Sequence, residues 1–211
     1  FNVDKSSVES YLSLFDDELK KSSSSQLLSH LNYSKYKDST ICKSLADEGD
    51  AEAMLHYGLM LLNGNGDQVK VNRKKAAKYI KQSADQGNAK AMFEYASMLY
   101  EGVGVQPNKK ESARYFKMAA DRDNKDAMII YGYMRQKGEI IDVNKKEAAR
   151  YIKMAADQGD TDAMYYYGII LEKGDGIPSD KEEAARYLKM AADHGNSSAM
   201  NFYSSLLRKG E

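Results

Sequence analysis

The amino-acid sequence predicts an all-α fold, a right-handed α/α superhelix (solenoid) of stacked helix-turn-helix repeats. The segment Asn-Lys-Lys-Glu at 108–111 returns at 144–147, which sets a repeat period of 36 residues. Within each period the apolar residues recur at helical spacing, and no stretch alternates apolar and polar residues as a strand does. One helix pair is too small to bury its own apolar stripe, so successive pairs are expected to stack.

The first helix of each unit, helix A, has an alanine followed by methionine, then a tyrosine four residues after the alanine and a small residue next to it. The alanines are Ala53, Ala91, Ala127, Ala163 and Ala199. The tyrosines are Tyr57, Tyr95, Tyr131, Tyr167 and Tyr203. The small residues are Gly58, Ala96, Gly132, Gly168 and Ser204. Because these positions recur in every unit, we expect them to form the core, where the small residue lets a neighbouring helix come close.

The second helix, helix B, is predicted to begin at a capping residue whose short side chain accepts from free amides of the first turn. These caps are Asn72, Asn108, Asn144 and Asp180. A glutamate follows three residues later in the last three units, as in a capping box, at Glu111, Glu147 and Glu183. Gly87, Gly159 and Gly195 then close the helix, because glycine accepts the left-handed conformation. Asp123 replaces that glycine in one unit, at a modest expected cost.

These recurring residues resemble the Sel1-like repeat, a relative of the tetratricopeptide repeat with a slightly longer loop between its helices. The resemblance lies in Ala-Met-x-x-Tyr-Gly, then Gly-x-Gly-Ile/Val, then Asp/Asn-x-x-x-Ala-x-x-Tyr-x-x-x-Ala-Ala-x-x-Gly. It covers about residues 37–211. The family often has tryptophan where this chain has a helix B tyrosine, such as Tyr79, and this chain has no tryptophan.

The predicted organisation is an N-terminal helical cap over 1–36, followed by repeats over 37–211. In the cap, an apolar stripe at helical spacing begins after Ser6 and contains Val8, Tyr11, Leu12, Phe15 and Leu19. The repeats comprise a degenerate first unit, four full repeats and a final helix A. That last helix lacks its helix B, so we expect it to leave an apolar face open.

Composition limits the possible partners. Lysine plus arginine and aspartate plus glutamate both number 31 in 211 residues, so the formal net charge is zero. Zero net charge argues against a nucleic-acid partner held by phosphate neutralisation. The longest apolar run is too short to cross a bilayer, so no membrane insertion is expected.

The single cysteine, Cys42, excludes the repeat-stapling disulfides found in some secreted Sel1-like proteins. This favours a cytoplasmic location. We expect Cys42 to be a small buried hydrophobe rather than a reactive thiol, because it lies where later units have Ile80 or Ile152. The chain begins at Phe1 rather than at methionine, so we expect it to be part of a longer protein.

No motif indicates catalysis, a cofactor or a metal. The pairs Gly64/Gly66, Gly102/Gly104 and Gly174/Gly176 could suggest phosphate-binding loops, but no strand precedes them, and they recur where helix A turns into helix B. The histidines lie in three different units, and none pairs with another ligand at metal-binding spacing. We therefore expect no catalytic residue, no cofactor and no metal site.

A binding surface is predicted where the units differ. The residues two, six and nine positions after the recurring alanine change from unit to unit, and by resemblance to tetratricopeptide arrays they line the concave face. The large apolar members form a set called here the helix A strip: Phe93, Tyr100, Ile129, Tyr133, Tyr165 and Ile169. Glu101, Lys137 and Lys173 are expected to flank it. An apolar strip rimmed by charge is typical of a surface that binds a protein or peptide. The alternative for any one residue is packing against a neighbouring helix B.

The function expected from these residues and from the resemblance is that of a non-catalytic scaffold or adaptor for protein–protein interaction. Two alternatives remain open at this point. The chain can be a regulatory or substrate-docking module of a larger catalytic protein. It can also be a hydrolase like some cysteine-rich Sel1-like relatives, although it lacks a nucleophile constellation.

Overall fold

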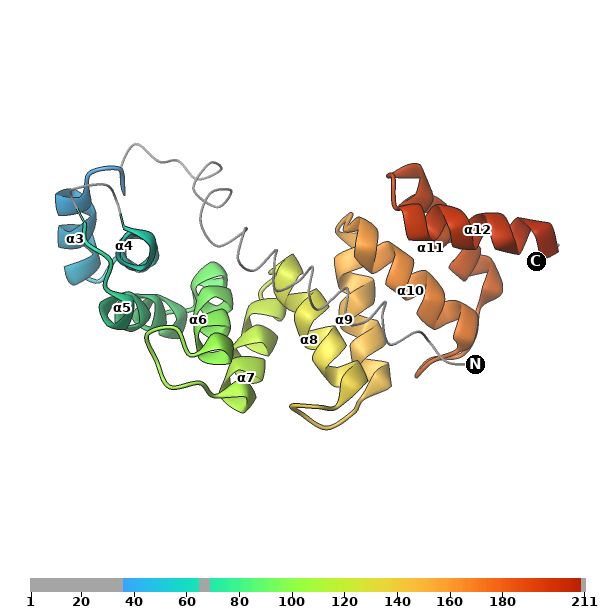
Figure 1. Ribbon diagram of the computed structural model, residues 1–211, viewed down its shortest axis with the longest axis horizontal. Helices are drawn as coiled ribbons and strands as arrows, with labels where there is room; N and C mark the ends of the chain where they lie inside the picture. The colour runs from blue at the N-terminus through green and yellow to red at the C-terminus, as the bar shows by residue number, and fades with distance from the viewer. Residues whose placement is uncertain (1–35, 65–68, 210–211) are drawn as a thin grey trace. The chain divides into compact units, whose positions relative to one another are not determined.

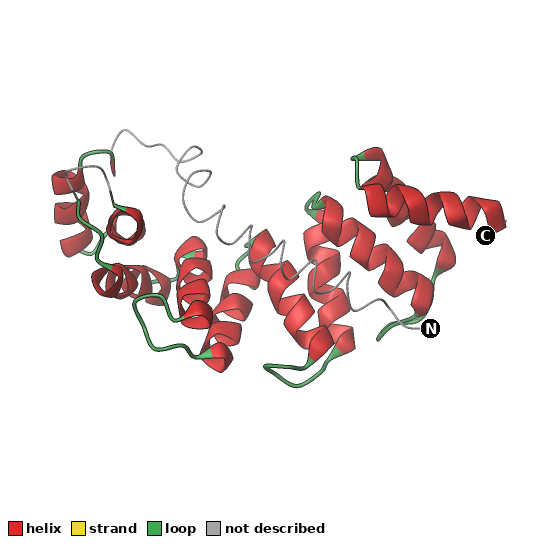
Figure 2. Cartoon of the chain, in the orientation of Figure 1, coloured by secondary structure: helices red, strands yellow, loops and turns green. Residues whose placement is uncertain are grey.

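The computed structural model describes residues 36–64 and 69–209, and the N-terminal cap predicted over 1–36 lies almost wholly outside them. Every regular element of the described residues is an α-helix, so the predicted all-α fold of stacked repeats is confirmed (Figures 1 and 2). The chain divides into two compact units, of which the first ends at Asn108 and the second begins at Lys109.

Each of these two compact units, called below the first unit and the second unit, stacks its helices in chain order, alternating helix B and helix A. The first unit contains α3 (Ser39–Asp47), α4 (Ala51–Asn63), α5 (Arg73–Asp85) and α6 (Ala89–Glu101). The second contains α7 (Lys109–Ala120), α8 (Lys125–Lys137), α9 (Lys145–Asp157), α10 (Thr161–Lys173), α11 (Lys181–Asp193) and α12 (Ser197–Lys209). The even-numbered helices are helices A, and the odd-numbered ones are helices B.

The predicted helix B starts are confirmed. The side chains of Asn72, Asn144 and Asp180 each accept from the backbone N–H three residues later, at 3.0, 3.0 and 2.9 Å. Helix α7 begins at Lys109, the residue after Asn108. Since such a cap satisfies an amide that has no partner within its helix, these residues fix where each helix B begins.

Helix A has its own recurring cap, directly after the glycine or aspartate that closes helix B. The caps are Asp50, Asn88, Asn124 and Asp160. Each accepts from the N–H of the recurring alanine, as Asn124 does from Ala127 at 2.8 Å. The recurring alanine thus has two roles, since its N–H completes the cap while its methyl group is fully buried.

The expected core positions are buried in the full repeats, apart from Tyr57. In the final helix A, Tyr203 is half-buried and Ser204 is exposed. Tyr95, Tyr131 and Tyr167 are buried and Tyr57 is half-buried. In the second unit Tyr131 meets Tyr151 edge-on, with ring centroids 5.0 Å apart. The small residue of helix A lies against helix B, because a Cβ added at Gly132 would be 2.9 Å from Ile152 Cγ1. Close approach at the small residue therefore joins helix A to the helix B of the same repeat.

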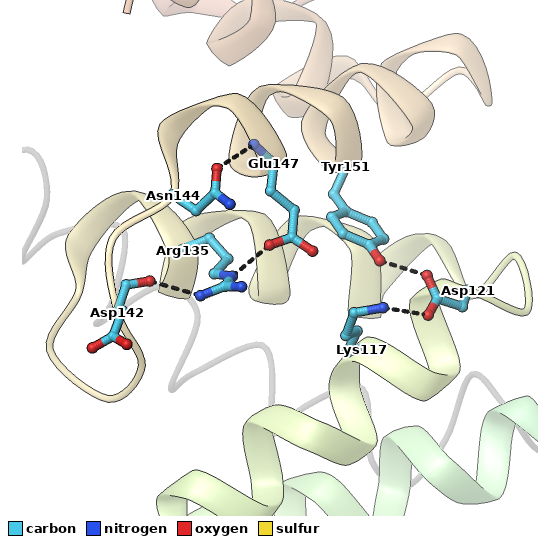
Figure 3. Close-up of polar contacts among 7 residues, drawn as sticks. All are labelled: Lys117, Asp121, Arg135, Asp142, Asn144, Glu147 and Tyr151. Carbon is cyan, nitrogen blue, oxygen red and sulfur yellow. Dashed lines mark hydrogen bonds and ion pairs between the residues drawn. The ribbon is translucent and has the colours of Figure 1, made fainter. Parts of the chain in front are cut away.

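Polar contacts join successive repeats within the second unit (Figure 3). Asp121 at the end of α7 accepts from Lys117 Nζ at 2.7 Å and from the Tyr151 hydroxyl of α9 at 2.5 Å. Asp157 accepts in the same way from Lys153 and from Tyr187 of α11. Burial alone would raise the pKa of Asp121, but the hydrogen bonds from Lys117 and Tyr151 outweigh it and hold that pKa below its ordinary value.

The loop between α8 and α9 has Ile140 where other loops have a second glycine, and a different set of contacts holds it. Arg135 donates through Nε to Glu147 at 2.7 Å and through Nη1 to the Asp142 carbonyl oxygen at 2.8 Å (Figure 3). Meanwhile the Glu147 N–H donates to Asn144. One arginine thus connects the end of helix A, the loop and the start of helix B.

Cys42 is fully buried, and its Sγ lies 3.5 Å from the Ala53 carbonyl oxygen. Burial raises the pKa of this thiol to about 11, and the nearby Asp50 carboxylate adds to the shift. A thiol this far from ionisation is a poor nucleophile. The expectation of a small buried hydrophobe is confirmed.

The final helix A has the open face that was expected. Met200 and Leu207 of α12 are 45% and 61% exposed, whereas Met164 and Leu171 at the same positions of α10 are buried. The difference shows which side chains a helix B covers in the other repeats.

Asp123→Gly is expected to stabilise the chain. Asp123 has φ 62, the only positive value for a residue other than glycine among the described residues. The left-handed conformation costs such a residue roughly 1 kcal/mol, and glycine adopts it freely. We expect the free energy of unfolding to rise by about 0.5–1 kcal/mol in urea titration. The reverse change Gly159→Asp, at the equivalent position, should lower it. A loss of stability in Asp123→Gly would show that the carboxylate contributes more than the backbone strain costs.

Candidate protein-binding surface

All six residues of the helix A strip lie on helices A. Phe93 and Tyr100 are on α6 in the first unit. Ile129 and Tyr133 are on α8, and Tyr165 and Ile169 are on α10, all in the second unit. The strip therefore consists of two parts, and each belongs to one compact unit.

In the first unit the expectation that Phe93 faces the open concave surface is wrong, because its side chain is only 7% exposed. Leu55, the equivalent residue of α4, is 1% exposed. In this unit the position two after the recurring alanine thus belongs to the packed side of helix A. Tyr100, in the last turn of α6, is half-buried.

In the second unit the strip residues are all half-buried: Ile129, Tyr133, Tyr165 and Ile169. This is the state expected of side chains that pack at their base and leave part of their surface to solvent. Two side-chain contacts show that α8 and α10 lie close together: Lys125 Nζ is 3.7 Å from Asp160 Oδ2, and Gln136 Nε2 donates to Asp175 at 3.4 Å. The four residues therefore form one local surface across two neighbouring repeats.

Tyr166 belongs to the same surface and was missed in the sequence. Its ring lies against that of Tyr165, with centroids 5.3 Å apart at 60°. Burial raises the pKa of Tyr166, and the electrostatic effects of Asp162, Tyr165 and Tyr133 raise it further. We call Tyr133, Tyr165 and Tyr166 the tyrosine cluster.

A signal for Tyr166 was present in the sequence. The position three after the recurring alanine varies as much as the positions that were chosen, since it holds His56, Glu94, Ile130, Tyr166 and Phe202. His56, Glu94 and Ile130 are buried, whereas Tyr166 is half-buried. The variation could have marked the position, but only the structure shows in which repeat it reaches the surface.

One of the expected flanking charges contacts the cluster. Lys137 Nζ lies 5.6 Å from the centre of the Tyr133 ring, a cation–π distance. Lys173 and Glu101 are exposed at the ends of α10 and α6. The surface of the second unit thus combines aromatic faces, hydroxyl groups and a cation, which together can accept apolar, polar and acidic side chains of a peptide.

Residues 36–64 and 69–209 contain no group of three or more histidine, cysteine, aspartate or glutamate side chains that could hold a metal ion. None of the helices in this part of the chain is long and apolar enough to cross a membrane.

Comparison with known proteins identifies the repeats. Four consecutive segments match the Sel1 repeat: residues 51–88, 89–124, 125–160 and 161–196. They follow the helix A–helix B units described above and take in more than half of the 211 residues. No curated protein sequence matches the chain.

Solved structures show the same fold. A Sel1 repeat protein from Oxalobacter formigenes is 28% identical, with a TM-score of 0.64, over 82% of this chain and 68% of that one. A protective antigen present in uropathogenic Escherichia coli strains, displaying an SLR fold, is 24% identical, with a TM-score of 0.76. This chain covers only 36% of that antigen, so it spans about a third of its length. On the match of its four repeats, the chain belongs to the Sel1 repeat family.

Proposed function

We propose that the chain is a non-catalytic scaffold or adaptor that binds a protein or peptide through helix A of its second unit. The observation that carries the proposal is the contrast between two sets of tyrosines on the same helices. Tyr131 and Tyr167 occupy a position that holds tyrosine in every repeat, and both are buried. Tyr133 and Tyr165 occupy positions whose residue changes between repeats, and both are half-buried.

Aromatic side chains at a variable, partly exposed position suit a binding surface. They offer a large contact area and lose little conformational freedom when a partner covers them. Such residues commonly dominate binding energy, whereas charges at the rim contribute less. We therefore assign Tyr133 and Tyr165 as anchors and Lys137 as a rim contact. Phe93 is buried and is not assigned as an anchor.

The test is a pull-down from a lysate of the source cells, with quantitative mass spectrometry. The double variant Tyr133→Ala/Tyr165→Ala is compared with the wild-type chain. We expect it to lose a specific partner, because truncating an anchor of this kind costs about 2 kcal/mol or more of binding. The partner would then be titrated against both chains to measure the change in Kd.

The matched control is Lys146→Ala/Glu182→Ala. Both residues are exposed on helices B of the same unit, and their charges cancel. Lys117 and Lys153 would be poorer controls, because each is tied to an aspartate in the contacts between repeats. Loss of the partner by the control, with retention by the tyrosine variant, would reject the helix A surface. Circular dichroism should show that both variants remain folded.

A further inference from the structure

A polar pocket lies in the first unit, between α3, α4 and α5. Its volume is about 370 Å³. The charged groups at its wall are Lys43, Lys75, Lys78 and Asp47, and the rings of Tyr57 and Tyr79 form another part. These two rings meet edge-on, with centroids 5.1 Å apart. The pocket contains no residue of the helix A strip.

The one carboxylate in the wall of this pocket, Asp47, already has two hydrogen-bond donors. Asp47 accepts from Lys43 Nζ at 2.6 Å and from the Tyr79 hydroxyl at 2.5 Å. These two hydrogen bonds hold the pKa of Asp47 below its ordinary value, so the carboxylate stays ionised. Lys78 also lies near enough to lower the pKa of Asp47. One carboxylate cannot neutralise three lysines, however, so the pocket keeps a net positive charge at Lys75 and Lys78.

Within the part of the chain that the structure describes, neither Lys75 nor Lys78 has a side-chain hydrogen bond or ion pair. Both are exposed, and they stand three residues apart on α5, so their ammonium groups lie on one side of the helix. Like charges at this spacing repel each other by a few tenths of a kcal/mol. An anion between them would remove that repulsion and gain two ionic contacts.

The other repeats show what normally fills this position. Three residues after the helix B cap, they have Glu111, Glu147 and Glu183. Glu183 forms an ion pair with Arg186 at 2.7 Å, and Arg186 is the equivalent of Lys78. Glu111 pairs with Arg114 in the same way, at 3.4 Å. Only the first full repeat has a lysine, Lys75, and α5 has no acidic residue in its first turn.

We propose that this pocket binds an acidic segment of a partner protein, whose carboxylate or phosphate group sits between Lys75 and Lys78. The incoming group takes the place that Glu183 holds beside Arg186 in the fourth repeat. The tyrosine pair contacts the adjoining side chain of the segment. This site is separate from the surface of the proposed function, and it holds if that surface proves not to bind.

The surroundings favour a protein segment over nucleic acid. A nucleic acid is held by many phosphates along an extended basic surface. Here the free positive charge is confined to two lysines beside an ionised aspartate, and the whole chain has zero net charge. A pocket of this size takes one or two acidic groups, which suits a short run of aspartate, glutamate or a phosphorylated residue.

The experiment is a calorimetric titration of the whole chain with two peptides, blocked hexaglutamate and a blocked peptide with one phosphoserine between glycines. Binding of either peptide supports the site if it depends on Lys75, and the relative affinities of the two peptides tell which acidic group the site prefers. The test variant is Lys75→Glu, which restores the residue of the other repeats. It should fold normally, since a glutamate in the first helical turn is favourable. We expect its affinity to fall about tenfold or more, as for loss of a charged hydrogen bond.

The matched control is Lys74→Glu, which makes the same charge change at the neighbouring exposed residue outside the pocket. We expect it to weaken binding less than about threefold, the effect of one exposed charge. The proposal is overturned if neither peptide binds, or if the two variants lose affinity equally. It is also overturned if single-stranded oligouridylate binds more tightly than both peptides and depends on Lys75. The variant Tyr133→Ala/Tyr165→Ala should bind the peptides as the wild type does.

Discussion

Gly132→Leu is expected to lower the free energy of unfolding by about 3 kcal/mol, near the upper end of the usual cost of overpacking. Gly132 is in the middle of α8, where helix A meets the helix B of its repeat. A Cβ at this position would be 2.9 Å from Ile152 Cγ1 and 3.3 Å from the Ala148 carbonyl oxygen. The isoleucine can rotate, but the carbonyl belongs to the backbone of α9. A leucine can therefore fit only if α8 and α9 move apart.

The measurement is thermal unfolding followed by circular dichroism, where this loss corresponds to roughly 6–12 °C for a chain of this size. Lys146→Leu is the control, because it adds the same side chain to an exposed position of α9. It should change stability by no more than about 0.5 kcal/mol. A melting temperature for Gly132→Leu within a degree of the wild type would contradict close approach at this position.

Gly132 and the helix caps illustrate what the sequence could predict. A cap such as Asn144 acts on an amide three residues away, and a closing glycine such as Gly159 acts on its own helix end. These effects are local, and the repeat shows them several times, so the helix boundaries and the core rows could be predicted. The tight contact at Gly132 could be predicted from the same recurrence, because a position that is small in every repeat indicates close packing of two helices.

The binding surface depends on contacts between residues far apart in the chain, and there the predictions were less complete. Phe93 and Tyr165 occupy equivalent positions, yet the first is buried and the second half-buried. The position of each residue within its own helix does not show which of the two is buried. The link between Tyr151 and Asp121 spans 30 residues and was not predicted either. Lys75 differs from these residues, because the sequence already shows that it stands where the other repeats have glutamate. Only the structure shows that it lies beside a pocket.

Gly176→Ala is expected to cost about 2–4 kcal/mol, although it adds only one methyl group. Gly176 is the second glycine of the loop after α10, and its φ is +88. An added Cβ would be 2.5 Å from the Lys145 carbonyl carbon and 2.8 Å from its oxygen, at the first residue of α9. Backbone atoms at a helix start cannot give way, so the loop itself has to shift. That shift would also disturb Asp175, which accepts from Lys145 Nζ at 2.6 Å.

Gly159→Ala separates the two causes of this loss. Gly159 has φ +85, and an added Cβ would meet no atom within 4 Å. Its substitution should therefore cost only the left-handed conformation, about 1 kcal/mol. The remainder of the Gly176→Ala effect, about 1–3 kcal/mol, measures the contact between the loop and the preceding helix B. Urea titration of both variants gives the two values. Equal losses would mean that the loop does not press on α9, and that the Gly-x-Gly pair is required for its backbone angles alone.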